Sequence, residues 1–299
     1  MNRSRLAPGA GIVTAPGGRP VLRTSEGEFL RIDTGHVGPG ELVDRLTEGE
    51  GQAPSAELDR LLAAFEEAGH AVTEPHRPPL TGRTVHLLGD PVLTEPLARF
   101  AAAEGAEVQS ASADDMTGLV GRRDTAVVWC LDSPVPEGLW DEADRLPARH
   151  TAWLRCHREG AHTWTEPLAS APGDVTAAHV RLRRLAATAA HRELAAYWAG
   201  HRTPDTGPHP TEPAAALIAA LLTADLIAWA SGEADRGEPR RGVPGVGEPL
   251  RGEPRKGARL PANRRLRRID LRDLTVTEHP VLPVPEVAPL PAPTARTAP

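Results

Sequence analysis

The sequence predicts a mixed α/β protein built from two modules, on the basis of two observations. Short alternating strands open the chain, whereas from Thr81 onward strands alternate with helices. The length of 299 residues also exceeds that of one typical domain. We therefore expect domains at 1–79 and 80–232, a Gly/Pro/Arg-rich loop at 233–262, and a strand-like segment with a Pro-rich tail at 263–299.

The first module is predicted to contain three strands followed by helices. The segments GIVTA, RPVLRT and EFLRID alternate in β fashion and are separated by PGG and SEGE, which supply turn residues. ELVDRL has helical spacing, and a second helix is expected between Ser55, a suitable N-cap, and Gly69. This order predicts a small winged-helix-like module.

The second module alternates between the two kinds of element. RTVHLLGD, AEVQSA and DTAVVWCLD predict strands, and LTEPLARFAAAEG predicts the helix between the first two. Further strands are expected at 153–155 and 161–167, a long helix over 175–198, and an apolar helix over 214–231. This alternation is typical of a sheet that contains βαβ units.

Composition and charge narrow the functional classes. The net charge of −6 argues against a protein whose main affinity comes from neutralising phosphates. Cys130 and Cys156 form no C-x-x-C pair, so we expect buried thiols in a reducing compartment. No signal-peptide-like stretch is present, and the apolar run 214–230 is short for a membrane span and contains Asp225. We expect a cytoplasmic protein that binds neither nucleic acid nor membranes.

The turn after the first strand of the second module is unsuited to a nucleotide. A phosphate site needs glycines whose backbone N–H groups approach the ligand at a helix N-terminus. Here Gly89 is followed by Asp90 and Pro91, which add an anion and remove an amide donor. We expect a packing turn and no bound cofactor.

Few other residues suggest a ligand-binding, catalytic or metal site. Asp132 follows a buried strand, where open α/β sheets place ligands, but without partner motifs we expect it to cap a helix. Cys130 lies within an apolar strand, where thiols are unreactive. No metal-ligand spacing occurs among six histidines that we expect mainly at surfaces or interfaces: His150, His157, His162, His179, His191 and His201. We therefore predict no bound metal.

Three stretches together resemble one family of proteins. They are the strands and helix ending in AAFEEAGHAV, the unit RTVHLLGDPVLTEPLARFAAAEGAEV, and the C-terminal RIDLRDLTVTEHPVLPVPEV. Their order resembles the ThiF-like cyclodehydratase partner proteins of azoline-forming peptide maturation. The resemblance implies an N-terminal peptide-binding RiPP recognition element before a degenerate ThiF-like, ubiquitin-activating-type α/β domain. The family's Cys-x-x-Cys zinc half-site is replaced here by EVAPLPAP.

The resemblance implies a role without catalysis. Such partners bind the leader of a ribosomally made precursor peptide and present it to a YcaO-type cyclodehydratase. That enzyme uses ATP to convert Cys, Ser or Thr residues to azolines, as in thiopeptide biosynthesis. The protein itself is then a scaffold, with a homodimer as a further possibility.

The resemblance also indicates where the leader would bind. An extended peptide can add to an exposed strand edge while a neighbouring helix supplies pockets for alternate side chains. The predicted strand residues are Glu28, Phe29, Leu30, Arg31, Ile32 and Asp33, and the predicted helix residues are Leu58, Arg60, Leu61, Ala64, Phe65 and Ala68. Arg31 and Arg60 could pair with acidic leader side chains.

Several alternatives stay open. The apolar members of that set could be plain core residues, and the two arginines could be solvated. An extended segment could dock on the partner enzyme or simply wrap the surface: His279, Pro280, Val281, Leu282 and Pro283. A winged-helix DNA-binding regulator is disfavoured because Glu57, Asp59, Glu66 and Glu67 would repel phosphates. A nucleotide-dependent adenylating enzyme would need the phosphate loop that the second module lacks.

Overall fold

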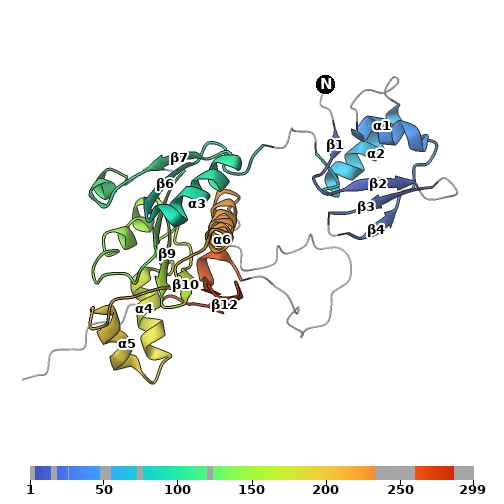
Figure 1. Cartoon of the computed structure of the whole chain (residues 1–299). Helices are drawn as coiled ribbons and strands as arrows, with labels where there is room; N and C mark the ends of the chain where they lie inside the picture. Colours follow the sequence, from blue (N-terminus) through green and yellow to red (C-terminus); the bar gives the residue numbers. More distant parts are fainter. Residues whose placement is uncertain are drawn as a thin grey trace, which may run out of the picture. The chain divides into compact units, whose positions relative to one another are not determined.

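The computed structural model divides into two compact units, Met1–Arg77 and Pro78–Pro299 (Figure 1). The division lies close to the predicted boundary at residue 79. The structure describes residues 4–14, 19–25, 27–47, 55–72, 77–119, 124–232 and 260–285. Most of the predicted loop at 233–262 and the end of the predicted Pro-rich tail lie outside these residues.

The N-terminal unit contains the predicted three-stranded meander and two helices. The strands are β2 (Gly11–Thr14), β3 (Pro20–Arg23) and β4 (Phe29–Arg31), and they pair antiparallel in that order. The helices are α1 (Pro39–Thr47) and α2 (Ala56–Glu67). A short antiparallel pair of β1 (Arg5–Leu6) and β5 (Ala71–Val72) was not predicted.

Apolar side chains of these helices and of β3 form one core. Leu42 and Leu46 of α1, Leu58 and Leu62 of α2, and Leu22 of β3 are all buried together. The side chain of Ser55 caps α2 by accepting the Leu58 N–H at 3.1 Å, which confirms the predicted N-cap.

The C-terminal unit is organised around a seven-stranded mixed sheet in the order β12-β11-β10-β9-β8-β6-β7. Its parallel half comprises β6 (Thr84–Gly89), β7 (Glu107–Ser110), β8 (Thr125–Leu131) and β9 (Ala152–Glu159). Its antiparallel half adds β10 (His162–Thr165), β11 (Arg265–Asp270) and β12 (Val276–Pro280) to β9. The segment from residue 263, predicted to be separate, therefore completes this sheet.

Both faces of the parallel half are covered. Along β8, Ala126, Val128 and Cys130 point into one apolar core, whereas Val127 and Trp129 point into another. The first core lies under α3 (Pro91–Ala103) and α6 (Glu212–Ala230), which lie side by side (Figure 1). Helix α6 is long and apolar enough to span a membrane, but much of it is packed in this core.

The predicted long helix over 175–198 is wrong. The structure has α4 (Ala177–Ala186) and α5 (His191–Trp198), separated by residues 187–190. The chain leaves α4 at Ala187, and the Thr188 hydroxyl accepts the Ala190 N–H at 3.2 Å, forming a local turn in place of the helical bond. Because both halves are alanine-rich, the spacing of apolar residues did not mark this break.

Candidate functional site

Strand β4 presents an open edge. Among the described residues its sheet neighbour is β3 alone. Leu30 lies opposite Leu22, flanked by bonds from Thr24 N–H to the Glu28 carbonyl (2.8 Å) and from Ile32 N–H to the Pro20 carbonyl (3.3 Å). Bonded pairs alternate along an antiparallel ladder, so the N–H and C=O groups of the intervening β4 residues, at positions 29 and 31, point to the open edge.

The side chains of this strand are also accessible. Phe29 is 63% exposed and Leu30 is 41% exposed, both unusual for large apolar residues. Leu30 shares a face with its buried partner Leu22, so it lies on the side of the sheet that carries the core. A peptide added beside β4 would place every second side chain on this same face.

Helix α2 supplies only part of the predicted groove wall. Arg60, Ala64 and Ala68 are exposed and therefore accessible to a ligand. Leu58 and Phe65, at 2% and 7% exposure, instead belong to the core, and their prediction as groove-wall residues is corrected. Their burial follows from the helical period, which turns them toward Leu62 and away from Ala64.

The end of β4 is tied to the start of α2. Leu61 on α2 and Ile32, just after β4, are half-buried against the same core. The His36 N–H donates to Glu57 Oε1 at 3.2 Å. Gly35 has a φ of 56°, and a Cβ there would lie 2.5 Å from that oxygen. These contacts bring α2 to the strand end, and the exposed charges of Glu28, Arg31 and Asp33 flank the edge.

The predicted docking segment is anchored on its own unit. Residues 279–280 pair with β11, and Val281 is buried. Arg183 donates to the carbonyls of Leu282 and Pro283 at 3.1 and 2.8 Å. These contacts fix the segment on its own unit, and Leu282, at 62% exposure, is an accessible apolar side chain on it.

The turn after β6 is shaped by packing. Gly89 has a φ of 107°, and a Cβ there would lie 1.8 Å from the Cys130 carbonyl oxygen, so only glycine fits. The Asp90 N–H donates to that carbonyl at 2.8 Å, and the Asp90 carboxylate accepts the Asp132 N–H at 2.6 Å. The Asp90 and Asp132 amides are thus already bonded, and Pro91 offers none.

Asp132 does not cap a helix. Its carboxylate accepts from Arg158 Nε at 2.5 Å and lies 2.5 Å from His209 Nδ1. Arg158 is 1% exposed and also pairs with Asp205 at 2.8 Å. This cluster neutralises a buried arginine that the sequence interpretation had missed. The sequence does indicate such a cluster, because charged side chains interrupt the otherwise apolar strand β9.

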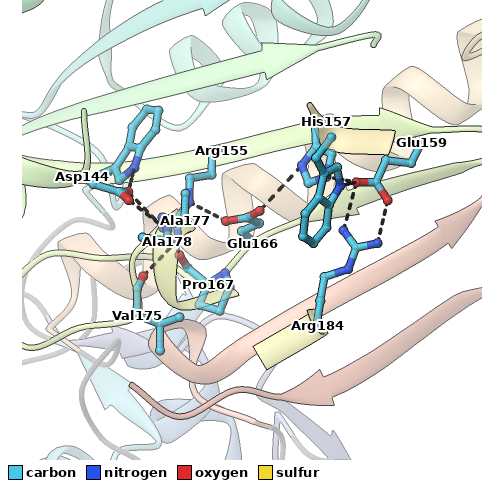
Figure 2. A network of polar contacts seen from close by, with 12 residues as sticks. Asp144, Arg155, His157, Glu159, Glu166, Pro167, Val175, Ala177, Ala178 and Arg184 are labelled. Atoms are coloured by element: carbon cyan, nitrogen blue, oxygen red, sulfur yellow. Dashed lines mark hydrogen bonds and ion pairs between the residues drawn. The ribbon is translucent and has the colours of Figure 1, made fainter. Parts of the chain in front are cut away.

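His157 likewise departs from the prediction of surface histidines. It is 3% exposed and lies between Glu159 and Glu166 (Figure 2). Burial by itself raises the pKa of Glu159, but the hydrogen bonds and charges of His157 and Arg184 outweigh it and hold that pKa well below its usual range.

The comparison with known proteins rests on three-dimensional similarity. No family model matches the sequence, and no curated protein matches it. The structure of the heterocyclase TruD is similar with a TM-score of 0.59 and 13% identity over 94% of this chain. A heterocyclase in complex with substrate and cofactor is similar with a TM-score of 0.59 and 11% identity over 95% of this chain. The chain spans 42% and 39% of the length of these two proteins.

A third similar structure is E. coli MccB with SeMet MccA. It has a TM-score of 0.51 and 9% identity, and the match covers 95% of this chain and 98% of MccB. The chain shares its fold with these proteins. At such low identity the likeness supports the predicted ThiF-like α/β fold and leaves the activity to be argued from the site.

The two cysteines give a first testable prediction. Cys130 and Cys156 lie opposite each other on β8 and β9, and both are fully buried. The hydrogen bond from Cys130 and burial raise the pKa of the Cys156 thiol well above its usual value. Because the thiolate is the reactive species, we expect neither residue to react with iodoacetamide in the folded protein and both to react in urea. Mass spectrometry measures this, and rapid labelling without denaturant would contradict the burial.

Proposed function

We propose that this chain is a non-catalytic partner protein that binds the leader of a ribosomally made precursor and presents it to a YcaO-type cyclodehydratase for azoline formation. The observation that carries the proposal is the open edge of β4. Its outward backbone groups at Phe29 and Arg31 and its exposed Leu30 can pair with an extended peptide. The N-terminal unit then acts as a winged-helix RiPP recognition element.

The fold likeness supports this setting. One similar structure is a heterocyclase in complex with substrate and cofactor, and another pairs MccB with MccA. This chain covers 42% and 39% of the two heterocyclases. The proposal assigns ring formation to the YcaO-type enzyme and leader capture to this chain.

The turn at the end of β6 favours the role without catalysis. A bound nucleotide would need free amide donors there, but the Asp90 and Asp132 amides are hydrogen-bonded within the fold. The Asp90 carboxylate also places negative charge at the start of α3, where phosphate would sit. We expect isothermal titration with MgATP to show no binding to this chain alone. Binding would instead favour the adenylating alternative.

A leader titration tests the peptide site. The probe is a fluorescent peptide with the leader sequence of the precursor encoded nearest to this chain, and fluorescence anisotropy reports its binding. We expect Leu30→Asp to weaken binding at least about tenfold, because it places a charge on the face where leader side chains would pack. The matched control is Val13→Asp on the other edge strand, β2, where Val13 is 44% exposed. Equal losses in both variants, or none in either, would refute the β4 site.

A further inference from the structure

A cavity of about 80 Å³ lies in the C-terminal unit between β9 and α4. Its wall includes His157 and Glu159 on β9, Arg184 on α4, Trp198 on α5, and Trp140 in the segment before β9. A volume of this size holds more than one water molecule. Neither the open edge of β4 nor the turn after β6 uses it.

The charges of Glu159, Glu166 and Arg184 at the cavity are already paired (Figure 2). Arg184 holds Glu159 through two bonds of 3.0 and 2.6 Å, and Trp198 Nε1 donates to the same carboxylate at 2.7 Å. Arg155 donates to Glu166 Oε2 at 2.7 Å. Asp144 accepts the N–H groups of the first turn of α4. A ligand is therefore not required to neutralise these groups.

Two buried polar atoms in the wall are nevertheless without hydrogen bonds. Among the described residues, His157 Nδ1 and Trp140 Nε1 have no hydrogen-bond partner, although the two residues are 3% and 4% exposed. His157 Nε2 faces Glu159 Oε1 at 3.3 Å, and the charge of His157 that lowers the pKa of Glu159 requires a proton on both ring nitrogens, so Nδ1 is a donor. Glu166 Oε1 lies 3.7 Å from Nδ1, too far for a hydrogen bond. A buried polar atom without a hydrogen bond raises the free energy of the fold, so a ligand that bonds to these atoms is favoured.

The cavity continues into a groove between α4 and α5. The groove has a volume of about 750 Å³ and shares Asp141, Arg181 and Trp198 with the cavity wall. Most of its lining side chains are small or apolar, among them Leu182 and Leu185 of α4, and the others are Glu137, Asp141, Arg181 and His201. A polar group bound inside could therefore be carried on an apolar chain that lies in the groove.

We infer that this cavity binds a carboxamide group, as found on an asparagine or glutamine side chain. The amide NH2 donates to Glu166 Oε1, and the amide carbonyl accepts from Trp140 Nε1 and from the N–H at His157 Nδ1. An ammonium group offers donors alone and leaves the Trp140 N–H unbonded. A carboxylate offers acceptors alone and faces the carboxylates of Glu159 and Glu166 in the wall.

The experiment compares three probes of matched size on the whole, isotopically labelled chain. Propionamide, propylammonium and propionate are titrated separately while NMR follows the Trp140 indole N–H and the His157 ring signals. We expect propionamide to shift both sets of signals with an affinity about tenfold above that of the other two. Stronger binding of propylammonium or propionate would overturn the inference, and so would a cavity that only water occupies, shown by no shift with any probe.

A pair of variants tests whether propionamide binds at Trp140. Trp140→Phe removes the indole donor, and we expect it to weaken propionamide binding as read from the His157 signals. Trp129→Phe is the matched control, because Trp129 lines a different hollow of the same unit and its loss should leave binding unchanged. Equal effects in both variants would contradict the assignment. If Trp140→Phe does not fold, the three-probe comparison on the unaltered chain still decides.

Discussion

Replacing Asp225 with alanine is expected to lower the free energy of unfolding by about 3–5 kcal/mol, since it breaks a buried ion cluster. Asp225 on α6 bonds Arg265 at 2.6 Å and Arg267 at 2.6 and 3.0 Å. The side chains of Asp225, Arg265 and Arg267 are 2%, 4% and 0% exposed, respectively. Burial alone lowers the pKa of Arg267, but Asp225 and Glu278 raise it overall, so the arginine stays charged.

Urea denaturation followed by circular dichroism measures this loss. The matched control is Glu212→Ala, which removes another acidic residue from the same helix at an exposed position. We expect the control to change stability by no more than about 0.5 kcal/mol. Equal stability of the two variants would show that the cluster does not hold α6 to β11.

Arg31→Pro is expected to weaken leader binding by about tenfold or more while leaving the N-terminal unit folded. Proline removes an N–H that points to the open edge of β4, and it leaves an acceptor of the added peptide unbonded. The ladder to β3 runs through Leu30 and is preserved. Anisotropy titration with the labelled leader gives the change in affinity.

The companion variant separates backbone from side chain. Arg31→Ala keeps the N–H and removes only the guanidinium group, so a much smaller loss is expected. If alanine weakens binding as much as proline, the side chain carries the interaction and strand addition at this residue is wrong.

Local signals predicted much of the fold. Alternation and turn residues located β2, β3 and β4, and the cap at Ser55 located α2 within one residue. Buried strands such as β8 were recognisable as continuous apolar runs. These features depend on residues that are close in sequence.

The features that were missed depend on distant partners. The strands β1 and β5 are two residues long and lie far apart in the chain, so no local pattern marks them. Asp225 was taken only as an interruption of an apolar run, because its arginines lie about forty residues away. Leu58 and Phe65 were assigned to the wrong surroundings for a different reason. Apolar spacing predicts that a helix has an apolar face, but it does not show whether the core or a ligand packs on that face.

The exchange of individual backbone amides on β4 tests leader capture most directly. NMR hydrogen exchange is measured on the labelled chain with and without saturating leader peptide. Addition of a strand predicts that the amides of Phe29 and Arg31 become protected, while that of Leu30, already bonded within the sheet, changes little. Saturating leader that leaves Phe29 and Arg31 exchanging as in the free protein would contradict capture at this edge.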